Sequence, residues 1–181
     1  MKKLEVIFAT IILVGLIFKI LFLPFASMFV ISCTALSALY MYFGFALFNN
    51  IPFKRLFKKE PYNEDISEKT GIRIGFAIAI GFALSLLLIG ILFNIQRWPM
   101  SRIMLIQGFT FLVLFSIFGL VRYIQTKSKF YKRIFIRVII IGGIGFVLLQ
   151  SPYMWFHFQY RNYPEYIETM ENYWKDPNNE P

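Results

Sequence analysis

The sequence predicts an all-α fold: a polytopic helical membrane protein with about five transmembrane helices. Hydrophobic residues make up 57% of the 181 residues and charged residues only 16%, whereas a typical soluble domain has about 25% charged residues. Five apolar runs are long enough for helices that cross a hydrocarbon core roughly 30 Å thick. The runs are apolar on every face, which excludes the alternating pattern of a membrane β-barrel.

The five runs define the elements in order, at 4–23, 25–48, 72–95, 100–123 and, more briefly, 134–150. The first run follows Lys2 and Lys3 and also resembles the apolar core of a signal peptide. It is longer than the roughly 7–15 residues of such a core and no cleavage site follows it, so we expect a retained helix. The expected organisation is a first transmembrane hairpin (1–50), a basic loop (51–71), a second hairpin (72–123), a second basic loop (124–133), a fifth transmembrane helix (134–152) and a tail (153–181).

Positive charges gather on one side of the predicted membrane. Fourteen of the 19 Lys and Arg residues fall at the N-terminus or in and beside the two basic loops. Cytoplasmic loops carry such an excess, so we expect a multi-pass protein of the bacterial inner membrane, with the N-terminus cytoplasmic and the C-terminus external, in the periplasm. Basic loops beside anionic lipid explain the net charge of +9, so no nucleic acid is expected as a partner.

The two hairpins form an internal repeat with an offset of 75 residues. The offset pairs Gly15 with Gly90, Phe18 with Phe93, Ile20 with Ile95, Pro24 with Pro99, Phe43 with Phe118 and Gly44 with Gly119. Because each copy crosses the membrane twice, both copies have the same orientation. They are therefore parallel repeats about an axis near the membrane normal, and the fifth helix lies outside the repeat.

Each hairpin turns at a proline on the outer side. Pro24 and Pro99 stand where one apolar run ends and the next begins, a place where proline disfavours continued helix. Trp98 suits the aromatic belt at the membrane surface, and Arg97 and Arg102 can extend their side chains to the headgroups. The favoured interpretation of these turn residues is topological anchoring, with a ligand site as the alternative.

The second turn resembles a known membrane hairpin. The stretch from Gly90 to Gly108, GILFNIQRWPMSRIMLIQG, is similar to the hairpin of the GldL family of gliding-motility proteins, approximately G-x-L-F-K-I-x-H-W-P-G-A-x-x-M-L-I-x-G. The matching residues are Gly90, Leu92, Phe93, Ile95, Trp98, Pro99, Met104, Leu105, Ile106 and Gly108, whereas Asn94, Arg97, Met100 and Ser101 depart. The first copy matches through GLIFKI, 15–20.

The resemblance implies an inner-membrane subunit of gliding or type IX secretion machinery, with a GldM-like protein as a partner. It also implies a proton-coupling carboxylate in the second helix of the hairpin, but here Leu112 and Ser37 occupy the matching region. No Asp or Glu lies inside a predicted span, and Glu5 is expected at the cytoplasmic edge of the first. Since a proton relay needs a titratable group at depth, we expect the hairpin architecture without the motor chemistry.

Small and polar residues indicate where helices pack. Gly75, Ala79 and Ala83 form one row of small residues, within this chain or against another subunit, and Ala77, Gly81 and Ser85 form a second row. Gln107 can hydrogen-bond across helices, and we favour packing over a substrate contact for it.

The loops and the tail suit a membrane surface. Residues 53–59 alternate apolar side chains with Lys54, Arg55, Lys58 and Lys59, a pattern typical of a turn that lies on anionic headgroups; a docking site for a cytoplasmic partner is the alternative. The aromatic residues from Tyr153 to Phe158 continue the interfacial belt, and a short helix is expected from Pro164.

Nothing in the sequence indicates an enzyme, a cofactor or a metal site. Cys33 has no partner cysteine, and His157, the single histidine, has no neighbouring ligands at metal-binding spacing. Two hypotheses remain, both with the lipid bilayer as the first partner. One is a structural or accessory subunit, homo- or hetero-oligomeric, of a membrane complex; the alternative is a small transporter or channel built from the parallel repeats.

Overall fold

The computed structural model describes residues 2–48, 69–151 and 153–175. Within these ranges the chain is helical and contains no strand, which confirms the predicted all-α class. The helices are α1 (Lys2–Ile20), α2 (Ser27–Phe48), α4 (Lys69–Gln96), α5 (Ser101–Thr126), α6 (Lys129–Gln150), α7 (Met154–Gln159) and α8 (Pro164–Lys175).

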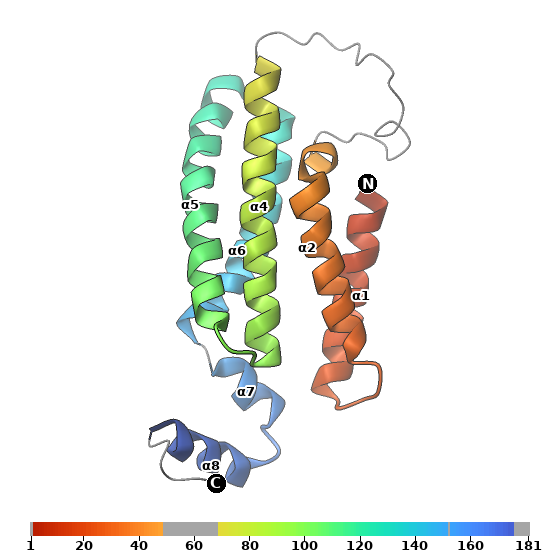
Figure 1. Ribbon diagram of the computed structural model, residues 1–181, viewed down its shortest axis with the longest axis vertical. Helices are drawn as coiled ribbons and strands as arrows, with labels where there is room; N and C mark the ends of the chain where they lie inside the picture. The colour runs from red at the N-terminus through yellow and green to blue at the C-terminus, as the bar shows by residue number, and fades with distance from the viewer. Residues whose placement is uncertain (1, 49–68, 152, 176–181) are drawn as a thin grey trace.

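The helices form two antiparallel hairpins and a fifth long helix (Figure 1). Helices α1 and α2 make the first hairpin, α4 and α5 make the second, and α4 packs against α2, α5 and α6. The short helices α7 and α8 lie at the end of the bundle opposite the N-terminus (Figure 1). Helix α8 begins at Pro164, as expected from the sequence, whereas α7 was not predicted as a helix.

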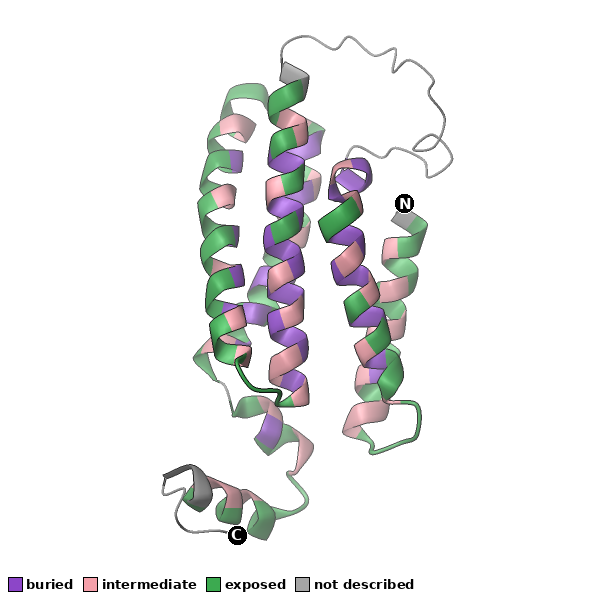
Figure 2. Ribbon diagram, viewed as in Figure 1, coloured by how far each residue is buried: buried purple, intermediate pink, exposed green. Residues whose placement is uncertain are grey.

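Helix α4 forms the centre of the core. Its residues Ala77, Ile80, Ala83, Leu84 and Leu87 are fully buried. Helices α5 and α6 instead carry apolar residues on exposed outer faces (Figure 2). An apolar outer surface of this extent is unfavourable in water and favourable in lipid.

Four helices are long and apolar enough to cross a membrane: α2, α4 from Gly71, α5 and α6. The chain is therefore a helical membrane protein. Helix α1 has the predicted helical structure but is not among these four, because Lys2, Lys3, Glu5 and Lys19 fall within its 19 residues. It packs along α2, and its length of about 28 Å is close to the thickness of a hydrocarbon core.

The 75-residue repeat is visible in the backbone of the two turns. Phe22 and Arg97 are equivalent positions and have φ angles of 54° and 58°. The amide of Leu23 donates to the carbonyl of Phe18 at 2.9 Å, and that of Trp98 donates to the carbonyl of Phe93 at 2.9 Å. This is the same helix-ending hydrogen bond in both copies.

The second basic loop is much shorter than predicted. Helix α5 continues to Thr126 and α6 begins at Lys129, so only two residues separate the two helices, in place of 124–133. Lys127 ends α5 with a φ of 48°, and the Ser128 hydroxyl accepts a hydrogen bond from the Phe130 amide as a helix cap. Apart from Lys127, the basic side chains of this region therefore stand on helices.

Candidate functional site

The turns of the two hairpins meet the C-terminal helices. Pro24 and Pro99 are exposed in the turns, as expected, and Trp98 is also exposed and packs edge-on against Phe93 with ring centroids 5.0 Å apart. The turn residues of both repeats contact the same tail side chain, because Phe22 lies 5.5 Å from the Tyr160 ring and the Arg97 guanidinium lies 5.0 Å from it.

Arg97 occupies an aromatic site rather than extending only to headgroups. Its guanidinium carbon lies 3.9 Å from the centroid of the Phe156 ring, a cation–π distance. Burial lowers the pKa of Arg97, and the neighbouring Tyr160 and Tyr166 side chains oppose that shift. Arg97 therefore fixes α7 to the second hairpin turn. This contact gives a structural role to one of the two arginines of the turn, Arg97 and Arg102.

A cavity of about 450 Å³ lies between this turn and the tail helices. Arg102, which is exposed, lines it together with Asn94 and Trp155. The Asn94 Oδ1 and Trp155 Nε1 atoms are buried and have no hydrogen-bond partner among the described residues. Asn94 Oδ1 can accept a hydrogen bond from a small polar ligand or from water, and Trp155 Nε1 can donate one to it.

The opposite half of the bundle holds a polar cluster that the sequence did not predict. Arg137 donates to Glu5 through two nitrogens, at 2.5 Å and 2.6 Å, and the Tyr40 hydroxyl donates to Glu5 Oε1 at 2.6 Å. Both charged side chains are nearly buried, at 14% and 15% exposure. Arg137 and Tyr40 each stand eight residues inside their helices, about 12 Å from the start of α6 and from the end of α2, whereas Glu5 lies in the first turn of α1.

Glu5 lies in the first turn of α1, at the edge of that helix as expected, but its side chain is paired inside the bundle. Helix α1 begins deeper in the bundle than α4 does (Figure 1), and this displacement carries Glu5 inward. A carboxylate held by a bidentate guanidinium and a hydroxyl has its acceptor sites filled, and the cluster joins α1, α2 and α6. Arg137 belongs to this cluster and not to a surface loop.

Of the predicted small-residue rows, the second packs within the chain. Gly81 approaches α2 so closely that an added Cβ would lie 2.6 Å from the Tyr40 carbonyl oxygen. The Ser85 hydroxyl lies 2.7 Å from that of Ser37. In the first row Ala83 is buried, Ala79 is half-buried, and Gly75 is exposed with open space around it.

The side chain of Gln107 is exposed and makes no hydrogen bond to a described residue. The sequence prediction that it bonds across helices is not fulfilled within the described part of the chain. The basic residues Lys54, Arg55, Lys58 and Lys59 lie outside the described residues.

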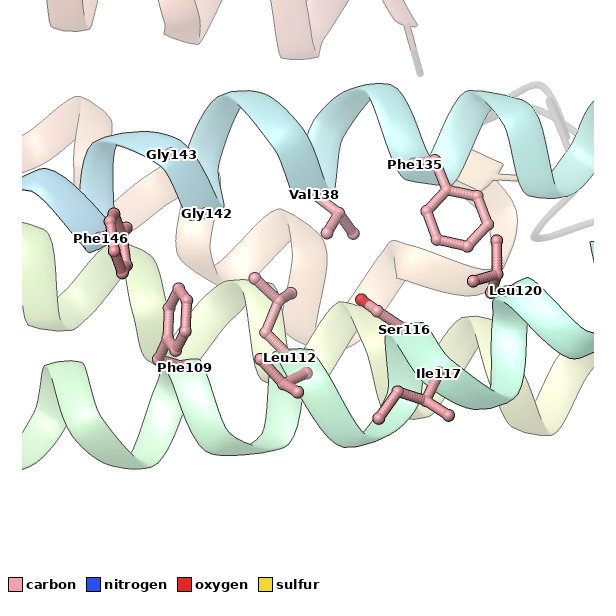
Figure 3. Close-up of a pocket in the computed structure, with 11 residues that line it drawn as sticks. Phe109, Leu112, Ser116, Ile117, Leu120, Phe135, Val138, Gly142, Gly143 and Phe146 are labelled. Carbon is pink, nitrogen blue, oxygen red and sulfur yellow. The ribbon is translucent and has the colours of Figure 1, made fainter.

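An apolar groove of about 430 Å³ runs between α5 and α6 on the outer wall of the bundle (Figure 3). Phe109 and Leu112 line it on α5, and Gly142, Gly143 and Phe146 line it on α6. Ser116 is directed toward α6 (Figure 3), and its hydroxyl is buried at the base of the groove without a hydrogen-bond partner among the described residues.

The tail and the remaining candidates take structural positions. His157 Nε2 lies 3.1 Å from Glu171 Oε1 and so connects α7 to α8. Cys33 is buried in the core. No cluster of three or more His, Cys, Asp or Glu residues that could hold a metal ion occurs within the described ranges.

Fold and surface define this chain as a polytopic helical membrane protein built on a repeated hairpin. No protein family, characterised protein or solved structure matches it.

Proposed function

We propose that this chain is an integral protein of a bacterial inner membrane that acts as a structural or accessory subunit of a membrane complex. It is related to the hairpin of the gliding and type IX secretion protein GldL and lacks the proton-coupling carboxylate. The two positions that match this carboxylate support the proposal: Ser37 is buried in the contact with α4, and Leu112 is buried where α5 meets α6.

The groove between α5 and α6 is the observation that carries the proposal. In lipid, helices associate through close packing of small residues and through hydrogen bonds between helices. Gly143 has open space around it, and Ser116 offers a hydroxyl that lacks a partner at the base of the groove. A transmembrane helix of a partner, GldM-like or a second copy of this chain, fits these features.

The proposed topology places the N-terminus in the cytoplasm and the C-terminus outside. In this topology α1 is a fifth span, because it packs along α2 and because its Glu5 carboxylate is paired inside the bundle. The described basic residues of the α5–α6 junction, Lys127, Lys129 and Lys132, then lie at the cytoplasmic end.

The experiment is co-purification from native membranes in mild detergent, followed by mass spectrometry. We expect the wild-type chain to retain a membrane partner or to self-associate. Gly143→Leu should fill the groove and break this association while leaving helicity and insertion intact. Ala9→Leu is the matched control, since it places the same side chain at an exposed site on α1. A monomeric wild type without a partner, or an unchanged Gly143→Leu complex, would overturn the proposal.

One observation favours the alternative function, a small transporter or channel. The Glu5 carboxylate is a titratable group paired inside the bundle, and such groups mark ion and proton pathways in membrane proteins. Its bidentate pairing with Arg137 favours the structural role. Ion flux through the purified protein separates the two functions.

A further inference from the structure

A second cleft lies at the end of the bundle opposite α7 and α8, where α4 begins, α5 ends and α6 begins. Its volume is about 330 Å³. Two arginines line it, Arg73 from α4 and Arg122 from the last turns of α5. Ser128 and Tyr131, from the start of α6, complete the polar wall.

The two guanidinium groups lie against aromatic rings and have no carboxylate partner among the described residues. Arg73 stands 4.8 Å from the Phe130 ring centroid and Arg122 stands 5.8 Å from that of Phe118. Arg73 Nε is buried and lacks a hydrogen-bond partner among the described residues. Neither arginine forms an ion pair in the described part of the chain, in contrast to Arg137.

The start of α6 adds to this positive potential. The unpaired amides at a helix N-terminus favour an anion, although they do not define a site by themselves. Here that N-terminus opens into the cleft at Ser128, beside the two arginines. Positive charge from three helices therefore converges on one cleft that contains no described negative group.

We propose that this cleft binds a phosphate group, and that an anionic phospholipid headgroup at the membrane surface supplies it. A guanidinium matches the oxygens of a phosphate with paired donors, and basic pockets between transmembrane helices hold acidic lipid headgroups. The cleft lies at the helix ends, where headgroups are found, and the exposed apolar face of α5 beside it accepts acyl chains.

The test is native mass spectrometry of the purified full chain in detergent, titrated with phosphatidylglycerol or with zwitterionic phosphatidylcholine. We expect preferential retention of phosphatidylglycerol. Each arginine replaced should weaken it about fivefold, corresponding to ~1 kcal/mol per basic residue at a membrane surface. The double variant, Arg73→Gln with Arg122→Gln, should therefore lose most of its retention of phosphatidylglycerol.

The matched control is Lys129→Gln with Lys132→Gln, which removes the same charge from exposed residues outside the cleft. Equal loss of phosphatidylglycerol retention in the two double variants would overturn the proposed site. Such a result would show that the lipid is attracted generally to the basic end of the bundle. If the double variant does not fold, Arg122→Gln alone keeps the test valid. Within the protein this substitution removes only a distant ring contact. Unchanged retention in Arg122→Gln would also overturn the proposal.

A second arm identifies the source of the phosphate. Inorganic phosphate is added in competition with phosphatidylglycerol. Failure of millimolar inorganic phosphate to displace the lipid supports the headgroup. Full displacement at that concentration overturns the lipid assignment.

Discussion

At the residue scale, the Glu5–Arg137 pair and the Tyr40 hydroxyl join three helices through a few short hydrogen bonds. Both side chains are nearly buried, so removing one partner leaves a charge without compensation. We expect Arg137→Met to lower the free energy of unfolding by about 3 kcal/mol. Glu5→Gln combined with Arg137→Met should recover most of this loss, because neither charge then remains. Thermal unfolding in detergent measures both.

Arg133→Met is the control, because Arg133 stands one turn earlier on α6 and only its carbonyl takes part, accepting from Arg137 at 2.8 Å. Its unfolding temperature should stay close to that of the wild type. If Arg137→Met and Arg133→Met lose the same stability, the pair makes no special contribution.

Two glycines on α4 make a second residue-scale prediction. In Gly81→Ala the new methyl group would collide with the backbone of Tyr40, so the variant should lose about 1–3 kcal/mol of stability. In Gly75→Ala the methyl group meets open space, so the variant should be neutral or slightly more stable, because alanine favours helix. Comparable losses in both variants would contradict the packing of α2 on α4 at Gly81.

Sequence reasoning found the small-residue rows but could not choose between them. The choice depends on the rotation of α4 about its axis, which places Gly81 toward α2 and Gly75 outward. The pairing of Glu5 with Arg137 was missed for a similar reason. The offset of α1 relative to α4, which brings Glu5 beside Arg137, arises only from tertiary packing.

At the scale of elements, Arg97 holds α7 against the second hairpin turn. Arg97→Gln removes the cation–π contact with Phe156, and a partly desolvated contact of this kind is worth about 1–2 kcal/mol. Helix α7 should then detach more often. Trypsin cleavage after the exposed Arg161 should become about five to thirty times faster, if it follows the detached population.

Arg102→Gln provides the matched control for that experiment. Arg102 belongs to the same turn and is exposed, and no aromatic ring lies in cation–π contact with it among the described residues. Its cleavage rate should equal that of the wild type. Faster cleavage in both variants would mean that surface charge, and not the ring contact, keeps the tail in place.

The elements themselves were largely predictable, because apolar length and the 75-residue repeat are properties of the sequence. The repeat reappears as the same backbone turn at Phe22 and Arg97. The α5–α6 junction was not predictable from charge, since a run of basic residues suits a loop and a helix end equally. The Ser128 hydroxyl accepts a hydrogen bond from the Phe130 amide, and this local cap fixes where α6 begins.

At the scale of the whole molecule, the distribution of charge predicts the topology. A reporter fused after Pro181 should be active only outside the cytoplasm, and one inserted near Asn63 only inside. Activity of both reporters on the same side would remove the model of five spans. Helices α4, α5 and α6 separate the two reporter sites whether or not α1 spans the membrane, so this pair of reporters tests those three helices.

The central claim is that the charged groups inside the bundle hold helices together and do not conduct. Glu5 tests it most directly, because it is the carboxylate found within the described bundle core. The protein is reconstituted in liposomes with an internal pH dye, a membrane potential is imposed, and wild type is compared with Glu5→Gln and with empty liposomes. We predict no proton flux above that of empty liposomes in either protein. A wild-type flux that Glu5→Gln abolishes would contradict the structural account and establish the transporter.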